Sequence, residues 1–246
     1  MIKSAPLRHE LMRLTAGAFI MGESLNDKFA NDTERPAHRV CCHDNILVGR
    51  YPVTVAEYRA YRPEHAHDEA AALPVVNVTW HDAVSYCDWL SQKTGALFRL
   101  LSEAEWEMAC RAGSRAPFAF GHDIDTKAAN YFYNEQGAHV GPGKRTPVGS
   151  YPANGFGLHD MHGNVCEWVE DLWHPDYEGA PEDGSAWVVN IGSGHRVVRG
   201  GAWDYLPRLL RSSWRDHALP SAHRDNLGFR IATEDLNLLD DEPATL

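Results

Sequence analysis

The stretch that most constrains how this chain can fold runs from Gly155 to Trp168 and reads GFGLHDMHGNVCEW. It combines three glycines with five large apolar side chains, which are those of Phe156, Leu158, Met161, Val165 and Trp168. Their spacing matches neither the helical nor the strand period. We therefore expect an irregular loop that is buried in the core, where its backbone polar groups need hydrogen-bond partners.

Two carboxylates in this stretch suggest a cation site. Asp160 and Glu167 bracket Gly163 and Val165, whose carbonyl groups could turn inward. Carboxylate and carbonyl oxygens are the ligands that Ca²⁺ prefers, so these four residues are candidate ligands of a structural calcium ion. On the residues alone, the alternative is that Asp160 caps a turn and Glu167 is a solvated charge.

Three hydroxyl–carboxylate pairs have the spacing of a helical capping box. The pairs are Thr54 with Glu57, Thr79 with Asp82, and Ser102 with Glu105. They predict three short helices, and Gly95 and Gly113 are placed to end the second and the third. Other segments predict strands at residues 14–21, 38–48, 196–203 and 226–232.

Length and charge limit the possible partners. At 246 residues, the chain is long enough for one large domain with a substantial core. Its net charge of −11, without a run of Lys or Arg, argues against nucleic acid as a partner. The apolar run at 16–21 is too short to span a membrane, and the N-terminus lacks the apolar segment of a secretory signal. We therefore expect a cytoplasmic protein without a membrane partner.

The five cysteines do not indicate a disulfide framework, because their number is odd. Cys87, Cys110 and Cys166 lie in segments rich in apolar residues and are expected to be buried free thiols. Cys41 and Cys42 are adjacent, so their side chains should point to opposite faces of a strand. No cysteine or histidine spacing typical of a metal site accompanies them.

Phrases spread along the chain resemble, in the same order, the signature phrases of the formylglycine-generating-enzyme family, also called the sulfatase-modifying-factor family. The stretch GFGLHDMHGNVCEW is similar to the family's NGFGLYDMxGNVWEW. The others are GAFIMG (17–22), GRYPVTVAEY (49–58), PVVNVTWHDAVSYCDWL (74–90), RLLSEAEWEMACRAG (99–113), TPVGSYPANGFGL (146–158), RVVRGGAWD (196–204) and NLGFRIA (226–232).

The resemblance covers residues 14–232 and implies one domain. Residues 1–13 would be an N-terminal extension and residues 233–246 an acidic, disordered tail. The implied fold is α+β, a variant of the C-type lectin fold with little regular secondary structure and with bound calcium. A second calcium site of the family would begin at Asn130 and the carbonyl of Tyr131, but residues 137–146 contain no acid to complete it.

The residues that hold copper in the family are missing. The founding enzymes convert a sulfatase cysteine to formylglycine with copper and oxygen, and two thiolates bind their copper(I), an ion that prefers soft sulfur ligands. The corresponding positions here are Tyr205 and Leu210, and Ala202 replaces the serine of the family's GGSW phrase. No cysteine follows Cys166. We therefore expect no copper and no standard formylglycine-generating reaction.

Two other enzymatic branches of the family are relevant. The iron-dependent sulfoxide synthases take their ligands from an added helical domain with a HxxxHxE motif, which this sequence lacks. The branch that oxidatively tailors siderophore chromophores lacks the cysteine pair, as this chain does.

The first functional hypothesis is a non-catalytic module that recognises a protein or a small molecule. Its expected ligand-binding residues alternate with scaffold positions and are Asp204, Tyr205, Leu206, Leu209, Trp214, Asp216 and His217. Tyrosine and tryptophan offer large contact area at low entropic cost. The variable proteins of diversity-generating retroelements use the same fold and region for ligand binding. The alternative is that Leu209 and Trp214 belong to the core and the histidines are solvated.

The second hypothesis is a noncanonical oxidoreductase of the same family that acts on a peptide-like metabolite. It predicts that five side chains converge in one cleft, namely His174, Asp204, Tyr205, His217 and His223. The first hypothesis is preferred, because the loss of both thiolates and the serine removes the groups assigned to the known oxidase chemistry.

Overall fold

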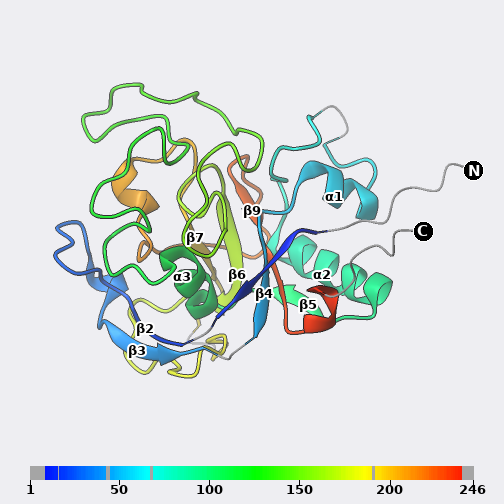
Figure 1. Cartoon of the computed structure of the whole chain (residues 1–246), viewed down its shortest axis with the longest axis horizontal. Coiled ribbons are helices and arrows are strands. Elements are labelled where there is room, and N and C mark those ends of the chain that lie inside the picture. Colours follow the sequence, from blue (N-terminus) through cyan, green and yellow to red (C-terminus); the bar gives the residue numbers. More distant parts are fainter. Residues whose placement is uncertain (1–8, 16, 43–44, 67–68, 190–191, 240–246) are drawn as a thin grey trace, which may run out of the picture.

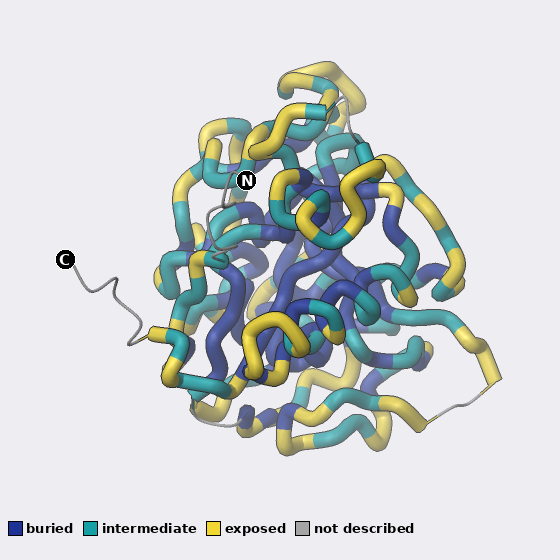
Figure 2. Tube along the Cα trace, turned by 90° about the vertical axis from the view of Figure 1, so that its right-hand side faces the viewer, coloured by how far each residue is buried: buried dark blue, intermediate teal, exposed yellow. Residues whose placement is uncertain are grey.

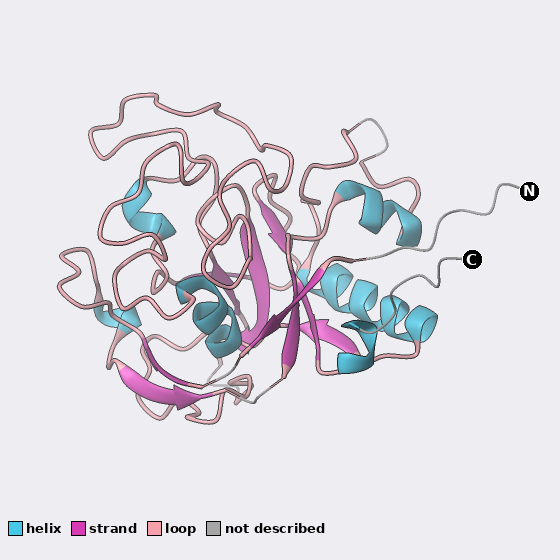
Figure 3. Ribbon diagram, viewed as in Figure 1, coloured by secondary structure: helices cyan, strands magenta, loops and turns pink. Residues whose placement is uncertain are grey.

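The computed structural model describes residues 9–15, 17–42, 45–66, 69–189 and 192–239. Long loops join short helices and strands, as Figure 3 shows. The expected α+β fold class is confirmed. Within the described ranges, no helix has the length and apolar character that crossing a lipid bilayer requires.

Two four-stranded sheets and a separate ribbon organise the chain (Figure 1). The first sheet has the order β1 (Leu11–Leu14), β4 (Ile46–Gly49), β10 (Ile231–Thr233) and β5 (Phe98–Leu100). The second has the order β8 (Asp216–Ala218), β7 (Arg196–Arg199), β6 (Cys166–Leu172) and β9 (Leu227–Phe229). The ribbon pairs β2 (Ala18–Met21) with β3 (His38–Cys41).

Strand β6 connects the Gly155–Trp168 stretch to the second sheet. It pairs antiparallel with β7, so that Glu167 lies opposite Arg199, and parallel with β9, so that Glu167 lies opposite Gly228. The end of the stretch is therefore enclosed between two strands.

The three helices begin as their capping boxes predict. They are α1 (Val55–Tyr61), α2 (Trp80–Thr94) and α3 (Glu103–Arg111), and each hydroxyl and each carboxylate makes its expected hydrogen bond. Gly95 ends α2 in the left-handed conformation, as predicted. The cap of α3 is Ala112 instead of Gly113, so that prediction is one residue late. In the part of the chain that the structure describes there are also three short 3₁₀ helices, η1 (Asp32–Glu34), η2 (Pro207–Leu210) and η3 (Leu236–Leu239).

Several predicted boundaries differ from the structure. Residues 14–21 and 38–48 each contain parts of two strands, because β3 pairs with β2 whereas β4 pairs with β1 and β10. The predicted N-terminal extension overlaps β1, which starts at Leu11. The predicted disordered tail is wrong for residues 233–239, because β10 includes Thr233 and Leu238 packs against the core. Residues 240–246 lie outside the described residues.

The buried interior contains large charged side chains as well as apolar clusters. Figure 2 shows buried segments through the middle of the molecule and exposed segments in the outer loops. Arg199, Arg211 and Arg230 are at most 1% exposed. Their partners are Glu103 and Glu107 for Arg199, Asp27 and Glu34 for Arg211, and Glu167 for Arg230. A buried guanidinium persists only when such a carboxylate compensates it.

Candidate functional site

The Gly155–Trp168 stretch is the buried, irregular loop that the sequence predicts. Gly163 forms a parallel bridge with Asn130, and the backbone N–H of Asn164 donates to the carbonyl of Asn130 at 3.0 Å. The Asn164 side-chain oxygen accepts from the N–H of Thr146 at 3.0 Å. These bonds join the stretch to the 130–146 segment and satisfy some of the buried polar groups of both segments.

The four predicted calcium ligands fit a cation only in part. The Glu167 carboxylate is fully buried and accepts from Arg230 at 2.9 Å and from the Trp106 indole at 2.8 Å. A positive partner therefore already compensates this charge. The Asp160 carboxylate accepts from the N–H of Gly149 at 2.9 Å, and burial raises its pKa. Calcium at these four residues stays a prediction.

The predicted start of a second calcium site shows an uncompensated acceptor. The side-chain oxygen of Asn130 is buried and has no hydrogen-bond partner among the described residues, whereas its amide nitrogen donates to Lys144 and Asn164. A buried acceptor without a partner is a position that a cation can satisfy. The missing acid in residues 137–146 leaves this site a prediction as well.

Tyr205, at the position of the first copper thiolate, belongs to a chain of polar groups. Its hydroxyl donates to Asp216 at 3.0 Å, and Asp216 forms an ion pair with Arg224 at 3.2 Å. Tyr205 also packs against the core cluster that contains Cys166, and the thiol and the phenol influence each other's pKa.

The thiol and the phenol of this chain of groups both stay protonated near neutral pH. Burial raises the pKa of the Cys166 thiol far above its ordinary value. The neighbouring Cys166 and burial raise the pKa of the Tyr205 phenol, and Asp216 adds to the effect.

Leu210, at the position of the second thiolate, is a core residue. It is fully buried and clusters with Phe118, Ala129 and Tyr131. Its carbonyl accepts from Nδ1 of His162 at 2.7 Å, and Nε2 of His162 accepts from the backbone N–H of Ala119 at 3.1 Å. Burial lowers the pKa of His162 to about 4, so the ring is neutral and ties the Gly155–Trp168 stretch to η2.

The structure brings together only some of the predicted ligand-binding residues. Tyr205 and Asp216 share a hydrogen bond, and the His217 ring packs on Trp173, with 4.4 Å between ring centroids. Asp204 instead accepts two hydrogen bonds from the Asn226 amide. Three other predicted residues are Leu206, which caps the start of η2, Leu209 within η2, and Trp214 after it. Among the described residues, no hydrogen bond joins any of them to Tyr205, Asp216 or His217.

The cluster that the oxidoreductase hypothesis predicts does not form, so this prediction is wrong. His174 is buried, its ring stacks on Trp187 at 3.5 Å, and its nitrogens face the carbonyls of Leu172 and Val189. His223 is exposed. Across the described ranges, no three histidine, cysteine or acidic side chains are grouped so that they could hold a metal ion.

A cavity of about 770 Å³ next to η2 was not predicted from the sequence. We call it the η2 cavity. Its lining comes from residues 26–29, 117–124, 131–136 and 207–211. Phe118, Tyr131 and Ile124 supply apolar wall, and Glu135 accepts from the backbone and the guanidinium of Arg208, at 2.7 and 2.5 Å. Two of the segments, 26–29 and 207–211, are far in sequence from the other two, and the four share no motif, so no sequence signal could have joined them.

Comparison with known proteins decides the family. The profile described as "Sulfatase-modifying factor enzyme 1-like domain" matches residues 2–235. The chain belongs to this formylglycine-generating-enzyme family. The solved structure of PvdO from Pseudomonas aeruginosa superposes with a TM-score of 0.85 and 36% identity, covering 94% of this chain and 96% of PvdO. The predicted family and its lectin-like α+β fold are thus confirmed.

Other relatives in the formylglycine-generating-enzyme family are longer than this chain. The serine/threonine-protein kinase pkn1 of Chlamydia caviae is 31% identical over 94% of this chain, which spans 39% of the kinase. The formylglycine-generating enzyme of Bos taurus is 33% identical over 72% of this chain and 46% of the enzyme. The chain thus spans less than half the length of these two relatives.

Proposed function

We propose that this formylglycine-generating-enzyme-family domain is a non-catalytic recognition module, and that the η2 cavity binds its ligand, a polar peptide-like molecule or a peptide segment. The observation that carries the proposal is the cavity itself, two of whose lining residues, Phe118 and Tyr131, pack against Leu210, the position of the second thiolate in the family. Its volume is within the range of known ligand pockets, which combine apolar walls with a few polar groups. A cytoplasmic location and the absence of nucleic-acid and membrane partners belong to the same proposal.

The Arg208–Glu135 pair supports recognition of a ligand with both charges. Both side chains line the cavity and are partly exposed, at 37% and 26%. A half-exposed ion pair contributes little to the free energy of unfolding. Breaking it therefore costs little, and Arg208 can then bind a ligand carboxylate while Glu135 binds a ligand ammonium group. Tyr205 and Leu210 offer no thiolate, so binding here does not depend on copper.

The test uses a cysteine-containing peptide of sulfatase type as the probe. We expect calorimetry to show that the peptide binds. Arg208→Ala should raise the Kd of the peptide about ten-fold, because a charge-assisted contact is lost. Lys93→Gln, which removes one positive charge from α2, should leave this Kd unchanged. The protein should neither bind copper(I) tightly nor consume oxygen with this peptide. Tight copper(I) binding with oxygen uptake, or a Kd that Arg208→Ala does not change, contradicts the proposal.

A second candidate function is a noncanonical oxidoreductase that acts on a peptide-like metabolite. It is favoured by the chain of protonatable groups from Cys166 through Tyr205 to Asp216, at the position where relatives carry a thiolate. For this function we expect the protein to take up oxygen in the presence of a substrate suggested by the neighbouring genes. Tyr205→Phe should abolish this oxygen uptake, and Arg208→Ala should retain it. A neighbouring reverse transcriptase would instead favour recognition.

A further inference from the structure

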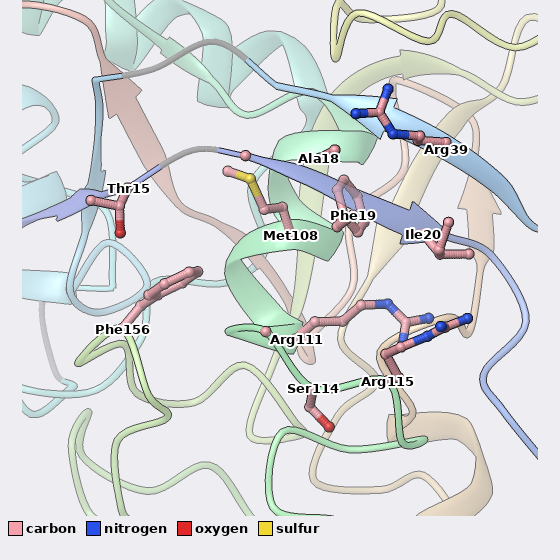
Figure 4. Close-up of a pocket in the computed structure, with 12 residues that line it drawn as sticks. Thr15, Ala18, Phe19, Ile20, Arg39, Met108, Arg111, Ser114, Arg115 and Phe156 are labelled. Atoms are coloured by element: carbon pink, nitrogen blue, oxygen red, sulfur yellow. The ribbon is translucent and has the colours of Figure 1, made fainter.

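A second cavity, of about 410 Å³, lies between strand β2 and helix α3, and we call it the β2–α3 groove. Figure 4 shows β2 passing over α3, with Phe19 and Met108 between them and Phe156 to the left of the helix, below Thr15. The groove shares no lining residue with the η2 cavity. It is therefore a separate feature of the molecule.

The walls of the groove are largely apolar. Phe19 and Ile20 contribute from β2, Met108 from α3, and Phe156 from the Gly155–Trp168 stretch. Met108 is 5% exposed, so the groove reaches the edge of the core. Such a surface gains free energy when an apolar ligand displaces water from it.

Positive charge accompanies this apolar wall. Three arginines line the groove, and none of its twelve described lining residues is acidic. Arg111 is compensated, because it donates to Glu107 at 2.8 Å and to the carbonyl of Gly22 at 2.6 Å. Arg39 and Arg115 are exposed, and no hydrogen bond or ion pair joins either guanidinium to another described residue. Figure 4 places Arg39 above β2 and Arg115 below its end.

We propose that the β2–α3 groove binds a small organic anion with an apolar body, of the monocarboxylate class. Each of the two guanidinium groups that lack a partner among the described residues can pair with a carboxylate, and both stand out in a chain whose net charge is −11. The apolar body then covers Phe19, Met108 and Phe156. A fully polar anion leaves these side chains in water, and a neutral hydrocarbon leaves both arginines without a partner.

The test compares three probes, octanoate, 1-octanol and inorganic phosphate, by calorimetry on the full chain at constant ionic strength. Octanoate should bind measurably, and at least about ten-fold more tightly than 1-octanol, which lacks the charge, while phosphate, which lacks the apolar body, should not bind. Equal binding of octanoate and 1-octanol, strong phosphate binding, or no octanoate binding overturns the proposal.

Four variants locate the site. Arg39→Gln and Arg115→Gln should each raise the Kd of octanoate about ten-fold, the loss expected for one charged hydrogen bond. Ala18→Phe, at an exposed lining position, should fill the groove and abolish binding. Lys93→Gln, an equal charge loss outside the groove, should bind as the wild type does. All four should melt cooperatively. The proposal is overturned if neither arginine substitution changes the Kd of octanoate, or if Lys93→Gln raises this Kd as much as the arginine substitutions do.

Discussion

Glu103 lies in the interior between two guanidinium groups and accepts from Arg199 at 3.0 Å and from Arg215 at 2.7 Å. Burial by itself raises the pKa of Glu103, but Arg215 and Arg199 outweigh it and hold this pKa below its ordinary value. The charge is therefore present in the folded protein and links α3 to β7 and to the segment before β8. Removing one member would leave an uncompensated charge in the core.

Asp171 behaves in the opposite way, and this predicts a pH dependence. Burial and the nearby Glu103 raise the pKa of Asp171 from 3.8 to about 7. Between about pH 4 and pH 7 the native state holds a proton that the unfolded state has lost, so stability falls as pH rises through this window. The free energy of unfolding of the wild type, relative to Asp171→Asn, should fall by up to about 1.4 kcal/mol per pH unit there and level off above pH 7. Urea titrations at several pH values measure it, and a pH-independent difference contradicts it.

At the scale of elements, the helix caps differ in their tertiary partners. The Thr79 hydroxyl caps α2 and otherwise bonds only within its capping box. The Ser102 hydroxyl caps α3, is buried, and also donates to the carbonyl of Gly184 at 2.7 Å. We expect Thr79→Ala to cost about 1 kcal/mol of unfolding free energy and Ser102→Ala about 2 kcal/mol, because it leaves a buried carbonyl without its donor. Equal losses in urea unfolding would argue against this difference.

The packing of the Gly155–Trp168 stretch is tested by two glycines with similar backbone angles. Gly163 has φ +88°, and a Cβ there would lie 2.4 Å from the carbonyl oxygen of Asn130 and 2.6 Å from the Leu210 side chain. Gly179 has φ +79°, with no atom within 4 Å of its Cβ position. We expect Gly179→Ala to cost about 1 kcal/mol from backbone strain alone and Gly163→Ala at least about twice as much. Similar melting temperatures for the two variants would show that the loop is not tightly packed.

At the scale of the whole molecule, a calcium ion at the predicted ligands would hold the Gly155–Trp168 stretch, which runs into β6, in its folded conformation. If Asp160 is a ligand, millimolar calcium should raise the melting temperature over that in EGTA, because a ligand that binds only the folded state stabilises it by mass action. Asp160→Asn should remove the increase, and Asp123→Asn, at an exposed residue, should keep it. An unchanged melting temperature in calcium and EGTA would remove Asp160 from the predicted ligand set.

Local sequence signals predicted a good part of the structure. The capping boxes placed the starts of α1, α2 and α3, since their hydrogen bonds join residues three positions apart. The mixture of glycines and large apolar residues predicted the buried loop, and Cys87, Cys110 and Cys166 are buried free thiols as expected. The strand boundaries were less accurate, because the pairing partner of each strand lies elsewhere in the chain.

By itself, the sequence determined the family, the absence of any cysteine after Cys166 and the local structure at the helix starts, because each of these depends on residues that are close together or in a fixed order. Only the tertiary structure decided that Cys166 adjoins Tyr205, that Glu167 pairs with Arg230, and where the cavities lie. The physical reason is that hydrogen bonding, charge compensation and enclosure join groups from distant segments. The spacing of residues along the chain does not indicate which distant residues come into contact.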